Sequence, residues 1–326
     1  MTDCSSPAPV KPVRRGRAGS WVVAIAAAYL AALWYIDRER NILAQLSNLN
    51  GTLALCAGLV LVSYAFRYQR WRSALSAQGL RLQGWRLGAL AYLAGFAFTA
   101  SPGKAGELLR IRYFGWQGVP AGATLATFIF ERALDLLVIT VLAIGAAHMI
   151  PAFGVLATII LGVLLILGLL ACWPPLARGA HRLIEYLPGS PVRRLGHFLI
   201  AGTRALDPLL CWRLLLRSAL QGGAAWLLTA LAFTLLCQAM GISLPWLLML
   251  SIYPLAMLIG ALSLVPGGVG TTEAAIVLML GASGVEVDAA LTVAIGIRLV
   301  SLWLAVVVGM LAMARLELAA RPRPAP

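Results

Sequence analysis

The sequence predicts an all-α polytopic membrane protein with about six spanning helices, two re-entrant hairpins and an inverted-topology repeat. Three observations predict this fold class. The 326 residues are 61% hydrophobic and only 12% charged, whereas soluble domains are about 25% charged. Several apolar runs reach the ~20 residues needed to cross the ~30 Å hydrocarbon core of a bilayer. A Pro-Gly-x-x-Gly turn also interrupts apolar sequence twice, which is typical of proteins built from two membrane repeats.

The first spanning helix is predicted at 20–36, directly after a basic N-terminal segment. A cleaved signal peptide is the alternative, but the run ends in Trp34-Tyr35-Ile36-Asp37-Arg38 with no small-residue cleavage site. We therefore expect an uncleaved helix that follows a disordered cytoplasmic N-terminus over residues 1–19. Further spanning helices are predicted at 52–66, 121–148, 153–173, 214–239 and 287–314.

Two other apolar segments, 87–117 and 245–282, are predicted to be re-entrant hairpins because each is interrupted in its middle. Proline removes a backbone donor and glycine loosens the chain, so a continuous helix is not expected through either interruption. Non-helical backbone at membrane depth survives only inside protein or beside a polar cavity. The predicted turn residues are Pro102, Gly103, Gly106, Pro266, Gly267, Gly268 and Gly270.

The basic residues orient this arrangement. If the N-terminus is cytoplasmic and each hairpin returns to the side it entered from, cytoplasmic segments hold 22 of the 26 Lys and Arg residues. This bias satisfies the positive-inside rule and places both termini in the cytoplasm. The cytoplasmic segments in that count are 11–17, 67–86, 104–112, 178–217 and 315–323.

The same orientation predicts two membrane repeats of opposite topology. The first hairpin enters from the cytoplasm and the second from outside, so each half consists of helix, helix, hairpin and helix. The alternative is that the two Pro-Gly interruptions match by coincidence. The predicted domains are a first repeat at 20–149, a second repeat at 150–315 with an interfacial segment at 174–212, and a cytoplasmic tail at 316–326.

A glutamate follows each turn, and an arginine lies 25 residues beyond each glutamate. The pairs are Glu107 with Arg132 and Glu273 with Arg298. Charged residues are costly in a membrane, so we expect each glutamate to face its arginine. A glutamate in the first turn of a helix also favours the helix dipole, so a purely structural role remains an alternative. If the site holds a lipid phosphate, the planar guanidinium groups of Arg132 and Arg298 are the preferred donors.

The segment 121–148 carries three charged residues close together: Glu131, Arg132 and Asp135. Each ionised group near mid-membrane costs roughly 2.5–3.5 kcal/mol, so they must be paired or hydrated. One basic and two acidic groups leave excess negative charge, for which Lys104 and Arg110 are candidate partners. The position in the second half that corresponds to Asp135 is Ser301, which predicts one asymmetric site. The candidate substrate-binding residues are Lys104, Glu107, Arg110, Glu131, Arg132, Asp135, Glu273 and Arg298.

Other functional classes lack support in the sequence. The net charge of +14 follows the positive-inside rule, so it does not indicate a nucleic-acid partner. The three histidines and five cysteines are scattered, without the spacing of a metal site or a catalytic triad. There is no Gly-rich ATP-binding loop. We therefore expect no cofactor, no metal and no catalytic residue.

Three motifs together resemble the family of the lysylphosphatidylglycerol synthase transmembrane region, also called flippase-like. They are Ser-Pro-Gly-Lys-Ala-Gly-Glu-Leu-Leu-Arg at 101–110, Glu-Arg-Ala-Leu-Asp at 131–135 and Pro-Gly-Gly-Val-Gly-Thr-Thr-Glu at 266–273. The resemblance covers nearly the whole chain after residue 20. The full synthases join this region to a soluble aminoacyl-transfer domain; this chain stops at Pro326, so we do not expect it to aminoacylate lipid alone.

The resemblance implies a bacterial inner-membrane, multi-pass translocase that moves a phospholipid or an isoprenoid-linked lipid between leaflets. Two alternatives remain open. The chain could be an intramembrane headgroup transferase with Glu131 or Asp135 as base. It could also be an accessory subunit that presents lipid to a separate lipid-modifying transferase.

Overall fold

The computed structural model describes residues 15–82, 84–186, 193, 196, 206–263 and 265–319, and this part of the chain is almost entirely helical with no β-strand. Four of its helical stretches are long and apolar enough to cross a membrane: 50–77, 153–172, 212–239 and 287–319. The chain is therefore an all-α polytopic membrane protein, as its composition predicted.

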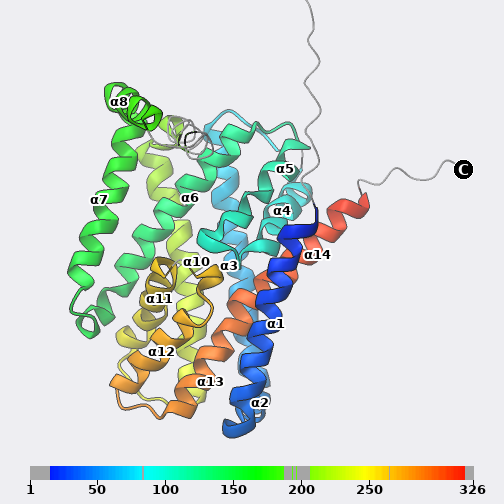
Figure 1. Cartoon of the computed structure of the whole chain (residues 1–326), viewed down its shortest axis with the longest axis vertical. Helices are drawn as coiled ribbons and strands as arrows, with labels where there is room; N and C mark the ends of the chain where they lie inside the picture. The colour runs from blue at the N-terminus through cyan, green and yellow to red at the C-terminus, as the bar shows by residue number, and fades with distance from the viewer. Residues whose placement is uncertain are drawn as a thin grey trace, which may run out of the picture.

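The described chain begins with two long helices joined by a short one: α1 (Arg15–Arg40), α2 (Ile42–Asn48) and α3 (Asn50–Ala77). Figure 1 shows α1 descending to α2 at one end of the molecule, and α3 rising from there into its interior. Helix α1 begins before the predicted residue 20, and α3 continues well past the predicted residue 66. The last turns of α3 stay helical because their side chains, including Arg70 and Trp71, are buried against other helices.

The first interrupted segment folds as a hairpin at the end of the molecule where α8 and the end of α14 also lie (Figure 1). Its backbone is held in tight 3₁₀ turns around the Pro-Gly pair rather than in a regular α-helix. The elements are α4 (Trp85–Ala94), η1 (Gly95–Phe98), η2 (Pro102–Leu109) and α5 (Arg110–Gly115).

The next helix carries the three predicted charges. Helix α6 (Ala121–Leu142) continues into η3 (Ala143–Met149), and α7 (Phe153–Cys172) returns to α8 (Pro174–Glu185). Most of α7 is exposed and apolar, as expected for a helix that faces lipid. In contrast, α6 has a largely buried polar face, which places its charges inside the protein.

The second half of the chain starts with α10 (Trp212–Ala239), which packs along α3 and contacts α6 and α11. Figure 1 shows α11 and α12 forming a second hairpin at the end opposite α4 and α5. The final stretch contains one π-helical turn, η6, directly after Arg298. The remaining elements are α11 (Trp246–Leu262), η5 (Pro266–Gly268), α12 (Thr271–Ala282), α13 (Val287–Arg298), η6 (Leu299–Trp303) and α14 (Leu304–Ala319).

The interruptions of the two hairpins touch each other inside the protein, where η2 contacts η5. Gly267 has a φ of +65°, which favours glycine, and a Cβ there would lie 3.1 Å from the Cα of Ala100. Only a residue without a side chain allows this approach. The two Pro-Gly turns, 164 residues apart at Pro102 and Pro266, therefore form one contact at the centre of the molecule.

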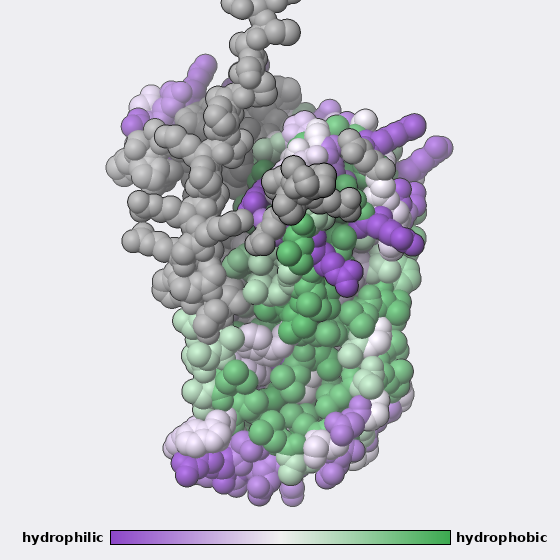
Figure 2. All heavy atoms as spheres, turned by 90° about the vertical axis from the view of Figure 1, so that its right-hand side faces the viewer, coloured by the Kyte–Doolittle hydropathy of each residue, from purple (hydrophilic) through white to green (hydrophobic). Residues whose placement is uncertain are grey.

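The surface agrees with a membrane environment. Figure 2 shows a face that is hydrophobic over its middle and hydrophilic at its lower end and upper right. A hydrophobic band between polar ends is what a bilayer requires of a spanning protein. The predicted tail beyond Ala319, residues 1–14, and most of 187–205 in the predicted interfacial segment lie outside the described residues.

Candidate functional site

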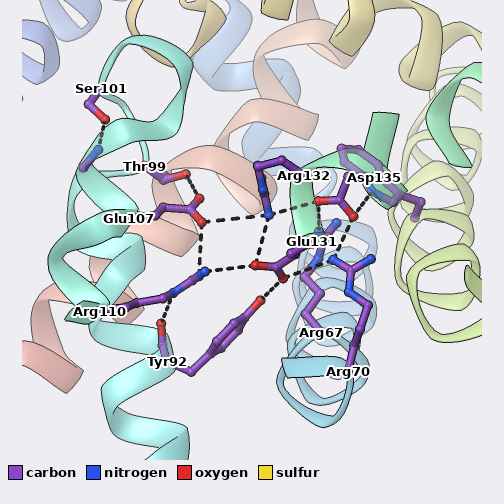
Figure 3. Close-up of polar contacts among 12 residues, drawn as sticks. Arg67, Arg70, Tyr92, Thr99, Ser101, Glu107, Arg110, Glu131, Arg132 and Asp135 are labelled. Carbon is purple, nitrogen blue, oxygen red and sulfur yellow. Dashed lines mark hydrogen bonds and ion pairs between the residues drawn. The ribbon is translucent and has the colours of Figure 1, made fainter. Parts of the chain in front are cut away.

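The charged residues of α6 lie inside the protein, among side chains from several helices. Glu131 and Asp135 are only 2% and 4% exposed. Figure 3 shows their carboxylates turned toward Arg67 and Arg70 of α3 and toward Arg110 of α5. Burial of these charges is tolerable only because they are paired and hydrogen-bonded.

Glu131 is the hub of this network. Its Oε1 accepts hydrogen bonds from the Tyr92 hydroxyl at 2.6 Å and from Arg70 Nη2 at 3.1 Å. Its Oε2 accepts one from Arg110 Nη1 at 3.0 Å. A single carboxylate therefore joins α3, α4 and α5 to α6.

Asp135 extends the network toward the second half of the chain. Its Oδ1 accepts hydrogen bonds from Arg70 Nη2 at 2.8 Å and from the Trp226 indole of α10 at 3.1 Å. Its Oδ2 lies 2.9 Å from Arg132 Nη2 and 3.6 Å from Arg67 Nη1. Asp135 thus holds arginines from two helices beside α10.

Arg67 and Arg70 were not predicted as site residues. We had assigned them, with Arg110, to cytoplasmic segments, but all three are buried in the protein. The remaining loop residues still carry the positive bias. The excess negative charge of α6 predicted that additional cations lie nearby. Arg67 and Arg70, one helical turn apart at the end of α3, could have been found as candidates on that ground.

Arg110 was a predicted balancing cation, and the structure confirms that pairing. Its Nη2 lies 3.1 Å from Glu107 Oε2, and its Nε donates to the Tyr92 carbonyl at 3.1 Å. Its guanidinium also sits 4.0 Å from the centre of the Tyr92 ring and 4.9 Å from that of Trp71. Cation–π contacts of this kind stabilise a desolvated guanidinium. Gly95 leaves room for it, since a Cβ there would collide with Arg110.

The predicted Glu107–Arg132 pair exists only as a long contact of 3.9 Å between Oε2 and Nη2. Glu107 instead accepts a hydrogen bond from Thr99 at 2.9 Å and pairs closely with Arg110. Arg132 lies closest to Asp135, its neighbour one turn along α6. Nearer partners on the same helical stretches therefore outcompete the predicted cross-helix pair.

The second predicted pair is confirmed as a direct hydrogen bond. Arg298 Nε donates to Glu273 Oε1 at 3.0 Å, and Arg298 Nη2 donates to the Gly267 carbonyl at 2.5 Å. Glu273 Oε2 accepts from the Gly270 amide at 2.9 Å, so the glutamate itself caps α12. The pair ties the Pro-Gly turn to α13.

The two halves differ as the Asp135 and Ser301 positions predicted. Ser301 carries no charge; its hydroxyl accepts from the Tyr253 hydroxyl at 3.0 Å and donates to the Ile297 carbonyl at 2.6 Å. In the first half of the chain the charged side chains form a network of ion pairs around Glu131 and Asp135. In the second half, Glu273 and Arg298 form an ion pair without net charge. The site is asymmetric.

A cavity of about 80 Å³ lies where the two halves meet. Arg67, Arg132 and Arg298 line it, together with Glu107. Arg132 is the most accessible of the four arginines in the network, with 21% of its side chain exposed. The rest of the wall consists of small hydroxyl residues, Gly267, and apolar and aromatic residues: Ser63, Thr99, Thr229, Ser301, Val60, Tyr64, Phe96, Trp226, Tyr253, Met257, Leu302 and Ala305.

Three of the predicted turn residues, all in the second hairpin, take up conformations that favour glycine. Gly267, Gly268 and Gly270 have φ values of +65°, +62° and +82°. The amide of Gly106 donates to the Ser101 hydroxyl at 2.6 Å, and a Cβ on Gly106 would collide with Phe98. The side chains of Pro102 and Lys104, and the position of Gly103, lie outside what the structure describes in detail.

The catalytic alternative finds little support in this geometry. A general base must reach a substrate proton at roughly 2.6–3.2 Å. Glu131 and Asp135 do not line the cavity, and arginines occupy both of their carboxylate oxygens. No cluster of His, Cys, Asp or Glu in the described part of the chain could hold a metal ion.

Gly222 of α10 offers a test of the network's packing. A Cβ at Gly222 would lie within 3.0 Å of Arg70 Nη1, whereas one at the adjacent Gly223 would meet nothing within 4 Å. We expect Gly222→Ala to lower the free energy of unfolding by about 1–3 kcal/mol, because a locked guanidinium cannot withdraw. Gly223→Ala should be neutral or slightly stabilising. Equilibrium unfolding in mixed micelles measures both; equal effects would contradict the proposed clash.

Comparison with known protein families matches most of the chain to a family model. The family model described as the lysylphosphatidylglycerol synthase TM region matches residues 21–309, which include every residue of the network and the cavity. No curated protein matches the chain.

Proposed function

Because the chain belongs to the family of the lysylphosphatidylglycerol synthase TM region, we propose that it is a lipid translocase of the bacterial inner membrane. The observation that carries the proposal is the cavity at the contact between the two hairpins. Arginines from both halves of the chain line it, and a guanidinium suits a phosphate oxygen. The headgroup would enter this cavity while the acyl chains stay in lipid.

In this proposal the two hairpins are re-entrant and belong to repeats of opposite topology. The contact between η2 and η5 supports it, since turns that reach the centre from opposite ends must meet there. Both termini would lie in the cytoplasm, on the side of α5 and α8. Lipid would then reach the cavity from either leaflet as the two halves rock against each other.

The ion pairs of Arg132 are compatible with a rocking movement of the two halves. Arg132 lies within 4.0 Å of three carboxylates, those of Glu107, Glu131 and Asp135. Asp135 is the nearest of the three, and a small shift of the halves would bring Arg132 closer to Glu107 or Glu131 instead. Arg298, in contrast, holds the turn at Gly267 and so couples the cavity wall to the second hairpin.

Arg132→Ala is expected to slow leaflet-to-leaflet lipid movement at least about tenfold, because a charge-assisted contact contributes roughly 1.5–3 kcal/mol. Purified protein in liposomes with a fluorescent lipid, quenched from outside, measures the rate. Arg213→Ala is the matched control, since Arg213 is exposed at the start of α10. Unchanged movement in Arg132→Ala, with the wild type active, would remove that arginine from the mechanism.

A bacterial strain that lacks this protein, together with purification of its binding partners, separates the alternatives. Lipid extracts from a deletion strain that lack a modified lipid, with no precursor trapped in one leaflet, would favour a headgroup transferase. Co-purification of a separate lipid-modifying transferase, with no transport by the isolated chain, would favour an accessory subunit. A precursor trapped in one leaflet supports the translocase.

A further inference from the structure

The network beside the cavity carries more positive than negative charge. Neighbouring members lie within 4.0 Å of one another, so the charges form one connected group. The Glu273–Arg298 pair in the second half of the chain is neutral by itself. The described members are four arginines, Arg67, Arg70, Arg110 and Arg132, against three carboxylates, Glu107, Glu131 and Asp135, which leaves one positive charge.

This excess faces the cavity. Arg70 and Arg110 are fully buried and do not line it, whereas Arg67 and Arg132 do. Arg67 approaches Asp135 only to 3.6 Å and lies over the Trp226 ring, 4.8 Å from its centre. The Nε of Arg132 is buried and has no hydrogen-bond partner in the protein. Arg70 also keeps two donors without a hydrogen bond, Nε and Nη1, but Arg70 does not line the cavity. The excess charge of the network therefore reaches the cavity through Arg67 and Arg132.

An uncompensated charge in such a place is costly. A buried ion without a partner strongly destabilises a protein, and charges at membrane depth are unfavourable as well. A ligand with one negative charge would neutralise the group. A cationic ligand would raise the excess to two.

We propose that the cavity selects a headgroup phosphodiester with a single net negative charge, and that it disfavours the cationic lysyl-lipid after which the family is named. This inference rests on the proposed function, since it assigns the substrate class of the same site. Arg67 and Arg132 donate to the phosphate oxygens, and Arg298 from the second half of the chain also lines the cavity. About 80 Å³ is enough for a group the size of several waters, which includes a phosphate.

A phosphate in this cavity could come from a lipid or from free inorganic phosphate, and binding separates the two sources. The melting temperature of the detergent-solubilised protein is measured with short-chain phosphatidylglycerol, short-chain lysylphosphatidylglycerol and inorganic phosphate. We expect phosphatidylglycerol to bind at least about tenfold more tightly than the lysyl-lipid. An equal rise in melting temperature with both lipids would overturn the inference. The same rise in melting temperature with inorganic phosphate at the same concentration would contradict a lipid as the source of the bound phosphate.

Arg67 provides the variant, with Arg81 as its control because Arg81 is exposed beyond the end of α3. Arg67→Gln should reduce phosphatidylglycerol binding at least about tenfold and abolish the preference over the lysyl-lipid, and Arg67→Lys should retain most of that preference. Arg81→Gln should match the wild type. If Arg67→Gln does not fold, the headgroup preference is still tested by the binding of both lipids to the wild type and to Arg67→Lys.

Transport is read separately in liposomes that contain each lipid. Movement of all headgroups at equal rates would overturn the charge selection but leave the translocase intact. Selective binding of phosphatidylglycerol without movement of any lipid would support the site and contradict the translocase.

Discussion

Glu131→Gln is expected to lower the free energy of unfolding by about 3–5 kcal/mol, the largest effect we predict for a single polar residue. The amide keeps the shape of the side chain but removes the charge that holds Arg70 and Arg110. Both guanidinium groups are almost fully buried, so neither can recover its hydration. Equilibrium unfolding in mixed micelles, followed by tryptophan fluorescence, measures the loss.

Two comparisons make this result specific. Glu39→Gln alters an exposed glutamate of α1 and should change stability by less than about 0.5 kcal/mol. The double variant Glu131→Gln with Arg70→Gln removes one charge of each sign, so its cost should fall well below the sum of the single costs. Additive costs, or a loss below about 1 kcal/mol for Glu131→Gln, would show that the charges are not coupled.

Gly309→Ala is expected to destabilise the protein by about 3 kcal/mol, at the upper end for overpacking. Gly309 lies on α14 against η1, and a Cβ there would lie within 3.0 Å of the backbone nitrogen of Ala97. Backbone cannot move aside as a flexible side chain can. α14 must therefore shift away from the first hairpin, and lipid movement should slow together with the loss of stability.

Gly162→Ala is the matched control for this substitution. Gly162 lies inside α7, where an added Cβ would meet nothing within 4 Å. Alanine favours a helix over glycine by about 0.5–1 kcal/mol, so this variant should be neutral or slightly stabilised. Similar melting temperatures for the two glycine variants would exclude close packing of α14 on η1 as the cause.

Much of the fold could be predicted from local pattern. The apolar runs predicted α7 and α10 almost to the residue, and the Pro-Gly pairs located both interruptions. Such features depend on hydropathy and on backbone chemistry within a short window, which the sequence displays directly. The boundary of α3 was missed because its last turns are polar and gain their burial from distant partners.

Most members of the candidate site were predicted, but Arg67 and Arg70 were missed and not all of the pairs were predicted correctly. Glu273 and Arg298 pair as their spacing predicted. Glu107 and Arg132 do not pair closely, because Arg110 and Asp135 lie nearer on the same helical stretches. Equal spacing identifies residues that can meet, but competing partners decide which ones do. That these residues bind substrate remains a prediction.

The sequence by itself determined that this protein is a helical membrane protein with two interrupted segments and too few acidic groups to stay neutral. Hydropathy and net charge are sums over residues, and the Pro-Gly interruptions are local patterns. None of these properties depends on tertiary contacts. Only the tertiary structure decided that the two turns touch at Gly267, that Arg67 and Arg70 enter the interior, and that an unmatched positive charge faces a cavity. The physical reason is that buried charges are stabilised by neighbours from distant parts of the chain, and folding alone brings those neighbours together.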